Sequence, residues 1–232
     1  MDRTGANFFS VVKQVQDKLH VTPVMLQIPI GQGAQFEGVI DLIQMRALYF
    51  EGKKGIEVVA KPIPEDYIEQ ANEYRAKMLE ALSMYDDELM EAILNETEFP
   101  AEKLIPIIRK ATLSHEITPM MCGSAFKDKG VQPLLDAVAA FLPSPLDRTV
   151  TAIDNDATAA ARKAGEIQPD EFKRITLTPD PSKPAIGMAF KTVVEQFGQL
   201  TYTRLYQGTL KKGETYTNTR TGKATRFGRL VR

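Results

Sequence analysis

The chain has 232 residues, of which 43% are hydrophobic and 25% charged, which is typical of a globular protein with one large or two small domains. Its single cysteine, Cys122, excludes an internal disulfide and a Cys-x-x-Cys metal site and suits a reducing compartment. No apolar run approaches the ~20 residues of a membrane span, and the N-terminus has no signal-peptide pattern, so we expect a cytoplasmic protein without a membrane partner.

The formal net charge of −1 hides two regions of opposite charge. Residues 63–98 carry eleven acidic and two basic residues, whereas residues 201–232 carry eight basic and one acidic. Such segregation suggests two surfaces with different partners. The alternative is that both are simply solvated faces.

Hydrophobic periodicity predicts a mixed α/β region over the first two thirds of the chain. In chain order we expect an amphipathic helix over 7–19, a buried strand over 24–28, strands over 36–42, 45–50 and 56–60, acidic helices over 64–82 and 86–94, a helix over 100–111, a strand over 117–121 and a helix over 131–142. Asp86 and Asp87 are expected to cap the second acidic helix.

The segment Pro143–Ser144–Pro145 is the clearest boundary in the chain. Residues 157–165 are small and polar, which indicates a loop or a short helix. Beyond Pro184 the pattern alternates, and strands are expected over 186–194, 201–207 and 214–219. Short strands at this spacing are typical of a β-barrel.

Two short motifs, separated by most of the α/β region, indicate chemistry. The chain opens on Met1–Asp2–Arg3–Thr4–Gly5, which resembles the end of the Asn-Lys-x-Asp motif of GTPases, cut after its Lys. Gly123–Ser124–Ala125–Phe126–Lys127 resembles the motif that closes over the same guanine base. Alone, Asp2 could be a frayed surface acid and Ser-Ala-x-Lys is a weak signal.

The sequence around both motifs resembles that of bacterial elongation factor G, a translational GTPase. The run from Cys122 to Val138 follows an apolar strand and opens a helix, as in that family, and a subdomain inserted between the motifs fits residues 24–116. The similarity continues through Pro143–Pro145 to Gly222–Lys223 and is weakest over 154–173.

The resemblance implies four guanine contacts. Asp2 would accept from the N1–H and N2 amino donors of the base, in charge-assisted bonds. Backbone N–H groups of Ser124–Ala125 would donate to O6, and the aliphatic stem of Lys127 would cover the base face. The family binds GTP or GDP with Mg²⁺ and acts on the ribosome.

The sequence also departs from a complete GTPase. It contains no Gly-x-x-x-x-Gly-Lys-Ser/Thr loop for phosphates and no Asp-Thr-Pro-Gly-His segment, and neither His20 nor His115 lies in such a setting. We therefore predict no catalytic residue and no metal ligand in this chain. It should not hydrolyse GTP or hold a nucleotide tightly.

The resemblance implies that the two charged regions bind the ribosomal stalk protein and ribosomal RNA. Binding to DNA is not expected. Glu69, Glu73 and Glu80 are the residues we select for docking on the acidic helices. A solvated helix surface remains the alternative.

The fold expected is the C-terminal part of a P-loop GTPase domain over 1–145, with its inserted α+β subdomain, a linker over 146–182 and the incomplete start of an all-β barrel over 183–232. The intact protein would be a ribosome-dependent elongation GTPase that promotes translocation of tRNA and mRNA. Two alternatives stay open: a release or ribosome-protection type of translational GTPase, and a free-standing interaction module.

Overall fold

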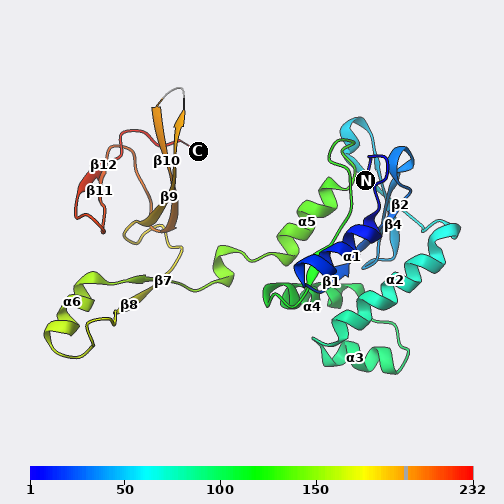
Figure 1. Ribbon diagram of the computed structural model, residues 1–232, viewed down its shortest axis with the longest axis horizontal. Helices are drawn as coiled ribbons and strands as arrows, with labels where there is room; N and C mark the ends of the chain where they lie inside the picture. The colour runs from blue at the N-terminus through cyan, green and yellow to red at the C-terminus, as the bar shows by residue number, and fades with distance from the viewer. Residues whose placement is uncertain (196–197, 232) are drawn as a thin grey trace. The chain divides into compact units, whose positions relative to one another are not determined.

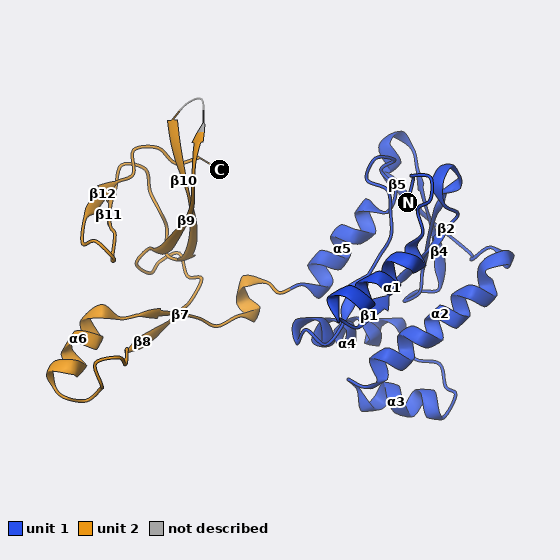
Figure 2. Ribbon diagram, in the orientation of Figure 1, with its two compact units in different colours: residues 1–142 blue, residues 143–232 orange. Residues whose placement is uncertain are grey.

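A computed structural model describes residues 1–195 and 198–231 of the chain. The chain divides into two compact units, residues 1–142 and 143–232 (Figure 2). Unit 1 contains α1 (Phe8–Leu19), β1 (Pro23–Met25), β2 (Gln27–Ile30), β3 (Gly38–Asp41), β4 (Arg46–Glu51), β5 (Glu57–Lys61), α2 (Glu65–Ser83), α3 (Asp87–Leu94), α4 (Ala101–Leu113), β6 (Thr118–Met120) and α5 (Val131–Phe141) (Figure 1).

The helices of unit 1 begin where the sequence signals predict. The Asn7 side chain caps α1 by accepting from the Ser10 N–H at 2.9 Å, and Asp86 caps α3 by accepting from the Leu89 N–H at 2.9 Å. Each cap satisfies a backbone donor that the first helical turn leaves without a partner. The predicted helices over 7–19, 64–82, 86–94, 100–111 and 131–142 are confirmed to within two residues at each end.

The single strand predicted over 24–28 is wrong, because the chain changes sheets at Leu26. β1 pairs in parallel with β6, whereas β2 joins the antiparallel sheet β2–β3–β4–β5. The Leu26 N–H donates to the Met120 carbonyl of β6 and its carbonyl accepts from the Leu42 N–H, both at 3.0 Å. One buried residue thus joins the two sheets.

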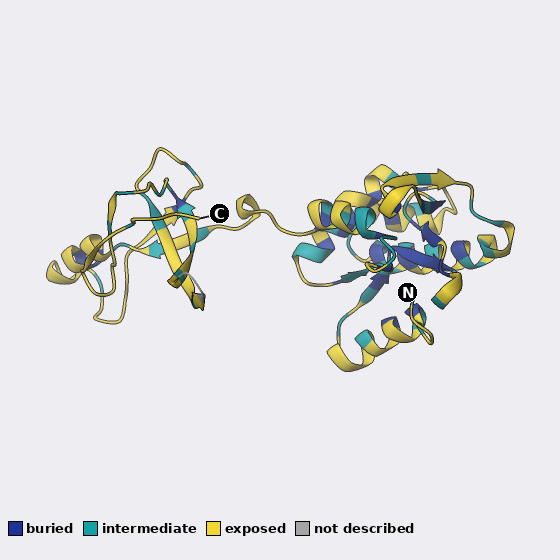
Figure 3. Ribbon diagram, turned by 90° about the horizontal axis from the view of Figure 1, so that it is seen from above, coloured by how far each residue is buried: buried dark blue, intermediate teal, exposed yellow. Residues whose placement is uncertain are grey.

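Both faces of the sheet are buried over β2, β3 and β4, whereas β5 is mostly exposed. Ile28, Ile40 and Ala47 pack in a core with α2, α3 and α4, whereas Val39, Leu48 and Phe50 pack against α1 and Cys122. The two sets alternate along the strands, as the pleat requires. The dark strands of unit 1 in Figure 3 show this burial.

Helix α2 is fixed to the sheet by polar contacts as well as by packing. The Arg75 guanidinium donates to the carbonyls of Leu42 and Ile43, and the Gly31 N–H donates to the Tyr67 hydroxyl at 3.1 Å. Tyr74 stacks on Phe9 of α1, with ring centroids 5.0 Å apart. These contacts tie α1, α2 and the sheet into one body.

The described residues of unit 2 form three antiparallel strand pairs, the helix α6 and a short 3-10 helix over Pro145–Asp147. Its elements are β7 (Val150–Ile153), α6 (Asn155–Lys163), β8 (Arg174–Leu177), β9 (Ile186–Glu195), β10 (Gly198–Gln207), β11 (Thr215–Thr217) and β12 (Ala224–Arg226). Within the described residues, the pairs β7–β8, β9–β10 and β11–β12 do not join into one closed sheet. Most of this unit is exposed (Figure 3).

An α/β part followed by a β-rich part confirms the predicted fold class. Residues 146–182, predicted as a linker, contain α6 and the antiparallel pair β7–β8. Strand β12 was not predicted. Strand β10 begins at Gly198, three residues before the predicted strand over 201–207. No helix in the described parts of the chain has the length and apolarity that crossing a bilayer requires.

The α4 packing gives a direct test of the unit 1 core. Ile108 is 0% exposed and Ile105, on the same helix, is 38% exposed. Ile108→Ala should lower the free energy of unfolding by about 2–5 kcal/mol, because it leaves a cavity. Ile105→Ala, the matched control, should change it by no more than about 0.5 kcal/mol. Urea unfolding followed by circular dichroism measures both, and equal losses would contradict the assigned orientation of α4.

Candidate functional site

The two motifs singled out in the sequence meet in unit 1. The Ser124 hydroxyl donates to Asp2 Oδ1 at 2.7 Å, although the residues are 122 positions apart. Ser124 is buried and Asp2 is half-buried. The Gly33 N–H of the inserted subdomain donates to the Met1 carbonyl at 2.9 Å, which fixes the backbone that carries Asp2 beside the sheet (Figure 1).

The loop over residues 124–130, which we call the 124–130 loop, is closed by its own backbone. Ser124 and Lys129 exchange two hydrogen bonds, with N···O distances of 2.8 and 3.0 Å. The Lys127 N–H donates to the Ser124 hydroxyl at 3.2 Å and the Asp128 N–H to the Ala125 carbonyl at 3.2 Å. The loop therefore has one defined conformation between β6 and α5.

Two glycines permit this tight closure. A Cβ at Gly123 would lie 2.7 Å from the Lys129 carbonyl oxygen. Gly130 has φ +84°, and a Cβ there would lie 2.9 Å from the Cys122 carbonyl oxygen. Since neither position has room for a side chain, the glycines belong to the construction of the loop.

The structure brings all four predicted guanine-contacting residues to one place, Asp2 and Ser124 in direct contact and Ala125 and Lys127 on the same loop. The Ser124 N–H already donates to the Lys129 carbonyl, and Ala125 is exposed. Lys127 is half-buried.

The environment of Asp2 favours its ionised form. The hydrogen bond from the Ser124 hydroxyl is the largest cause that holds the pKa of Asp2 below its ordinary value, followed by a backbone hydrogen bond. The nearby Lys127 ammonium acts in the same direction. At neutral pH the carboxylate is therefore an acceptor only, as recognition of two adjacent N–H donors requires.

Cys122 lies at the base of the loop and takes no part in its chemistry. Burial raises the pKa of its thiol to about 12, so the thiol stays protonated and unreactive. It packs with Phe36 and Phe50 of the inserted subdomain.

The acidic residues selected for docking lie on α2 and are all exposed. Glu73 forms an ion pair with Lys77, while Glu69 and Glu80 have no ion pair among the described residues. Of the two basic residues in this region, Arg75 turns toward the sheet carbonyls. The outer face of α2 is therefore more acidic than the residue count alone indicates.

The basic residues of the C-terminal region are exposed on unit 2, with Arg232 outside the described residues. Lys211 lies 3.8 Å from Glu214, and the Arg226 side chain donates to the Gly213 carbonyl at 3.0 Å. The remaining positive charge faces solvent.

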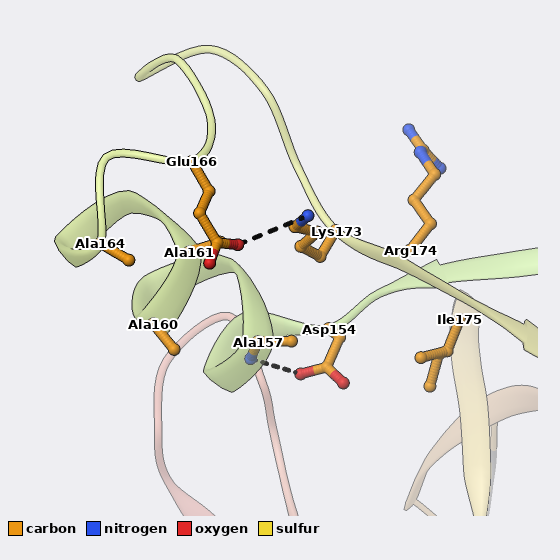
Figure 4. A pocket seen from close by; sticks show the side chains of 9 residues that line it. All are labelled: Asp154, Ala157, Ala160, Ala161, Ala164, Glu166, Lys173, Arg174 and Ile175. Carbon is orange, nitrogen blue, oxygen red and sulfur yellow. Dashed lines mark hydrogen bonds and ion pairs between the residues drawn. The ribbon is translucent and has the colours of Figure 1, made fainter.

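An open pocket of about 580 Å³ lies beside α6 in unit 2 (Figure 4). Four of its lining residues are alanines, and its charged groups already have partners: Asp154 caps α6 through the Ala157 N–H at 2.9 Å, Lys173 pairs with Glu166 at 3.9 Å, and Arg174 donates to the Thr151 hydroxyl at 3.4 Å. It has no set of groups converging on a ligand.

Sequence reasoning missed three residues through which the insert holds the 124–130 loop: Gly55, Lys129 and Gln132. Lys129 and Gln132 lie inside or next to a recognised motif. Their partners, however, lie 93 and 77 positions away, and no local pattern indicated them.

No family model matches the chain, but curated proteins do. Elongation factor G of Rhodopirellula baltica is 50% identical over 232 residues, and elongation factor G 1 of Borreliella afzelii and of Treponema pallidum are 46% and 44% identical. Each match covers 100% of this chain and 31–32% of the relative. The resemblance is confirmed, and the chain spans about a third of the length of these relatives.

A solved structure supports the fold. A crystal structure of a protein from Thermus thermophilus matches 97% of this chain and 28% of its own, with a TM-score of 0.66 and 23% identity. At this identity the likeness shows the fold alone.

The contact between Ser124 and Asp2 can be tested without a ligand. Ser124→Ala should raise the pKa of Asp2 toward its ordinary value, because the largest cause of its depression is removed. An NMR titration of the carboxyl carbons measures this. Asp180, whose pKa is lowered by Ser182 in unit 2, is the internal reference and should not move.

A pKa of Asp2 that is the same in both proteins would contradict the contact. The sign for stability follows from linkage: a depressed pKa favours the folded state while the carboxylate is ionised. The stability that wild type gains over Ser124→Ala should therefore be present at neutral pH and fade as the pH falls through the pKa of Asp2.

Proposed function

We propose that this chain is the segment of an elongation factor G that carries the guanine-reading half of the nucleotide site and the start of the second domain. The intact protein would be a ribosome-dependent GTPase that promotes translocation of tRNA and mRNA. The observation that carries the proposal is the Ser124–Asp2 hydrogen bond, which joins the two base-reading motifs at 2.7 Å. Identity of 41–50% to proteins named elongation factor G supports the family.

The residues present fit a guanine base. Asp2 supplies a carboxylate that its surroundings keep ionised, and Ser124 holds one of its oxygens in place, so that the carboxylate can accept from N1–H and the N2 amino group. The exposed Ala125 supplies a backbone N–H for O6, and the stem of Lys127 would lie on the base face. Adenine presents the opposite donor and acceptor at these positions, so the same set would reject it.

The phosphates and Mg²⁺ of GTP or GDP supply much of the binding energy in such proteins, through backbone N–H groups and the metal. This sequence has no Gly-x-x-x-x-Gly-Lys-Ser/Thr motif to hold them. We therefore propose that the chain by itself neither hydrolyses GTP nor binds GDP tightly, and that both properties belong to the intact protein.

Partners follow from the two charged surfaces. We assign the acidic face of α2, with Glu69, Glu73 and Glu80, to the ribosomal stalk protein, and the basic surface of unit 2 to ribosomal RNA, in the cytoplasm. The exposure of the acidic residues and the inward turn of Arg75 support the first assignment. The exposed lysines and arginines of residues 204–229 support the second.

The guanine site is tested with Asp2→Asn in the protein expressed from the complete reading frame. An amide replaces one accepting oxygen with a donor, so affinity for GDP should fall roughly 10- to 150-fold, the equivalent of one hydrogen bond to a charged group. Asp17→Asn, an exposed acid on α1, is the matched control and should leave affinity unchanged.

Calorimetry with GDP measures both variants. Unchanged affinity of Asp2→Asn would remove Asp2 from the site. In parallel, the 232-residue chain with Mg²⁺ and GTP should release no phosphate above a buffer control, with or without ribosomes. Turnover that survives repurification would show that this chain holds catalytic groups.

The docking face is tested by reversing Glu69, Glu73 and Glu80 to Lys together. Association with the stalk protein should slow by roughly tenfold or more at low salt and lose most of its salt dependence, because electrostatic steering is removed. The control variant reverses three other exposed acids of unit 1, Asp17, Glu37 and Glu57, to Lys. It therefore has the same net charge as the α2 variant. Equal rates for the two triple variants in stopped-flow measurements would mean that the α2 face is merely solvated.

A further inference from the structure

The insert contacts the 124–130 loop and the first turn of α5 through two hydrogen bonds. The Lys129 ammonium donates to the Phe36 carbonyl at 3.0 Å, and the Gln132 side-chain amide donates to the Gly55 carbonyl at 2.6 Å. Both acceptors are main-chain atoms of the insert, and both donors lie in the loop or in the first turn of α5. The loop is thus held by residues that lie 93 and 77 positions away in the sequence.

A close backbone contact adds to these bonds. Gly55 ends the turn between β4 and β5 with φ +58°, and a Cβ placed there would lie 2.4 Å from the Asp128 carbonyl oxygen. Asp128 itself has φ +54°, a conformation that a non-glycine residue rarely adopts. The backbone of Gly55 therefore packs directly against the backbone of Asp128, with no room for a side chain between them.

Both acceptor carbonyls, of Phe36 and Gly55, belong to buried residues. Phe36 is 1% exposed and packs with Val39, Leu48 and Phe50, and Gly55 is buried. The Oε1 atom of Gln132 is buried and accepts no hydrogen bond from the described residues, so its side chain is held by its donation to Gly55 and by packing.

We propose that Gly55, Lys129 and Gln132 are positioning residues through which the inserted sheet sets the 124–130 loop against Asp2. The inference rests on the proposed guanine site and adds to it: the insert contributes to nucleotide retention without touching the nucleotide. Removing one of these contacts leaves Asp2, Ser124 and Lys127 in the sequence and lets the loop open.

The test uses the protein expressed from the complete reading frame, with Gly55→Ala and Gln132→Met. Amide hydrogen exchange over residues 124–130 should speed up in both variants and stay unchanged over residues 104–111 of α4. GDP release should accelerate roughly 3- to 10-fold in Gln132→Met, the effect of losing one neutral hydrogen bond, and more in Gly55→Ala.

Gly52→Ala is the matched control. Gly52 lies in the same turn with φ +73° and ψ −176°, a conformation that essentially only glycine adopts, so alanine there is strained by the backbone, but its Cβ would meet only the Glu57 side chain, at 3.3 Å. This variant should lose thermal stability without faster loop exchange or faster GDP release. Equal effects of Gly52→Ala and Gly55→Ala on GDP release would overturn the proposal, since strain alone would then explain both.

Loop exchange that rises without faster GDP release would also overturn it, since the contacts would then hold the loop without positioning the base. Failure of the proposed function is a different result. In that case the wild-type protein does not bind GDP, and hydrogen exchange alone still decides whether the insert holds the loop.

Discussion

The architecture of unit 1 depends on a sheet whose strands β2, β3 and β4 are buried on both faces. Val39 and Ile40 are neighbours in β3, and each is 0% exposed, one against α1 and the other against α2 to α4. A sheet covered on both sides cannot shift relative to its helices without exposing apolar surface, at roughly 25 cal/mol per Å². It therefore forms a rigid support, and Asp2 and the 124–130 loop are attached at the end of the sheet where the β2–β3 and β4–β5 connections lie.

This support explains how a site can be built from residues far apart in sequence. The insert provides the Gly33 N–H group, which binds the Met1 carbonyl, and the carbonyls of Phe36 and Gly55, and Asp2 and the loop meet where these converge. Polar groups so placed are organised before a ligand arrives, which lowers the entropy lost on binding. The apolar core continues to the base of the loop through Cys122, whose high thiol pKa reflects the same burial.

The sequence allowed the helices to be predicted because their signals are local, such as hydrophobic periodicity and the cap residue Asp86. The strand over 24–28 was predicted wrongly because an apolar run does not show that Leu26 changes sheets. Strands β8 and β12 were missed because they are short and mostly exposed, and so carry little apolar pattern. Asp2 and Ser124 were found through motifs, whereas Gly55, Lys129 and Gln132 act through distant backbone atoms that leave no local pattern.

Unit 2 has a much smaller hydrophobic core than unit 1. Its buried apolar residues among those described are few, Ala161 and Leu177, while Met188, Phe190 and Tyr202 of the β9–β10 hairpin are about half exposed. An isolated two-stranded hairpin is marginally stable in water, and exposed edges invite pairing. Gln207 compensates in part, since its side chain joins two segments by accepting from the Thr178 N–H and donating to the Pro184 carbonyl. Unit 1 is thus stabilised chiefly by its core, whereas unit 2 depends more on hydrogen bonds and has more to gain from a partner that covers its apolar side chains.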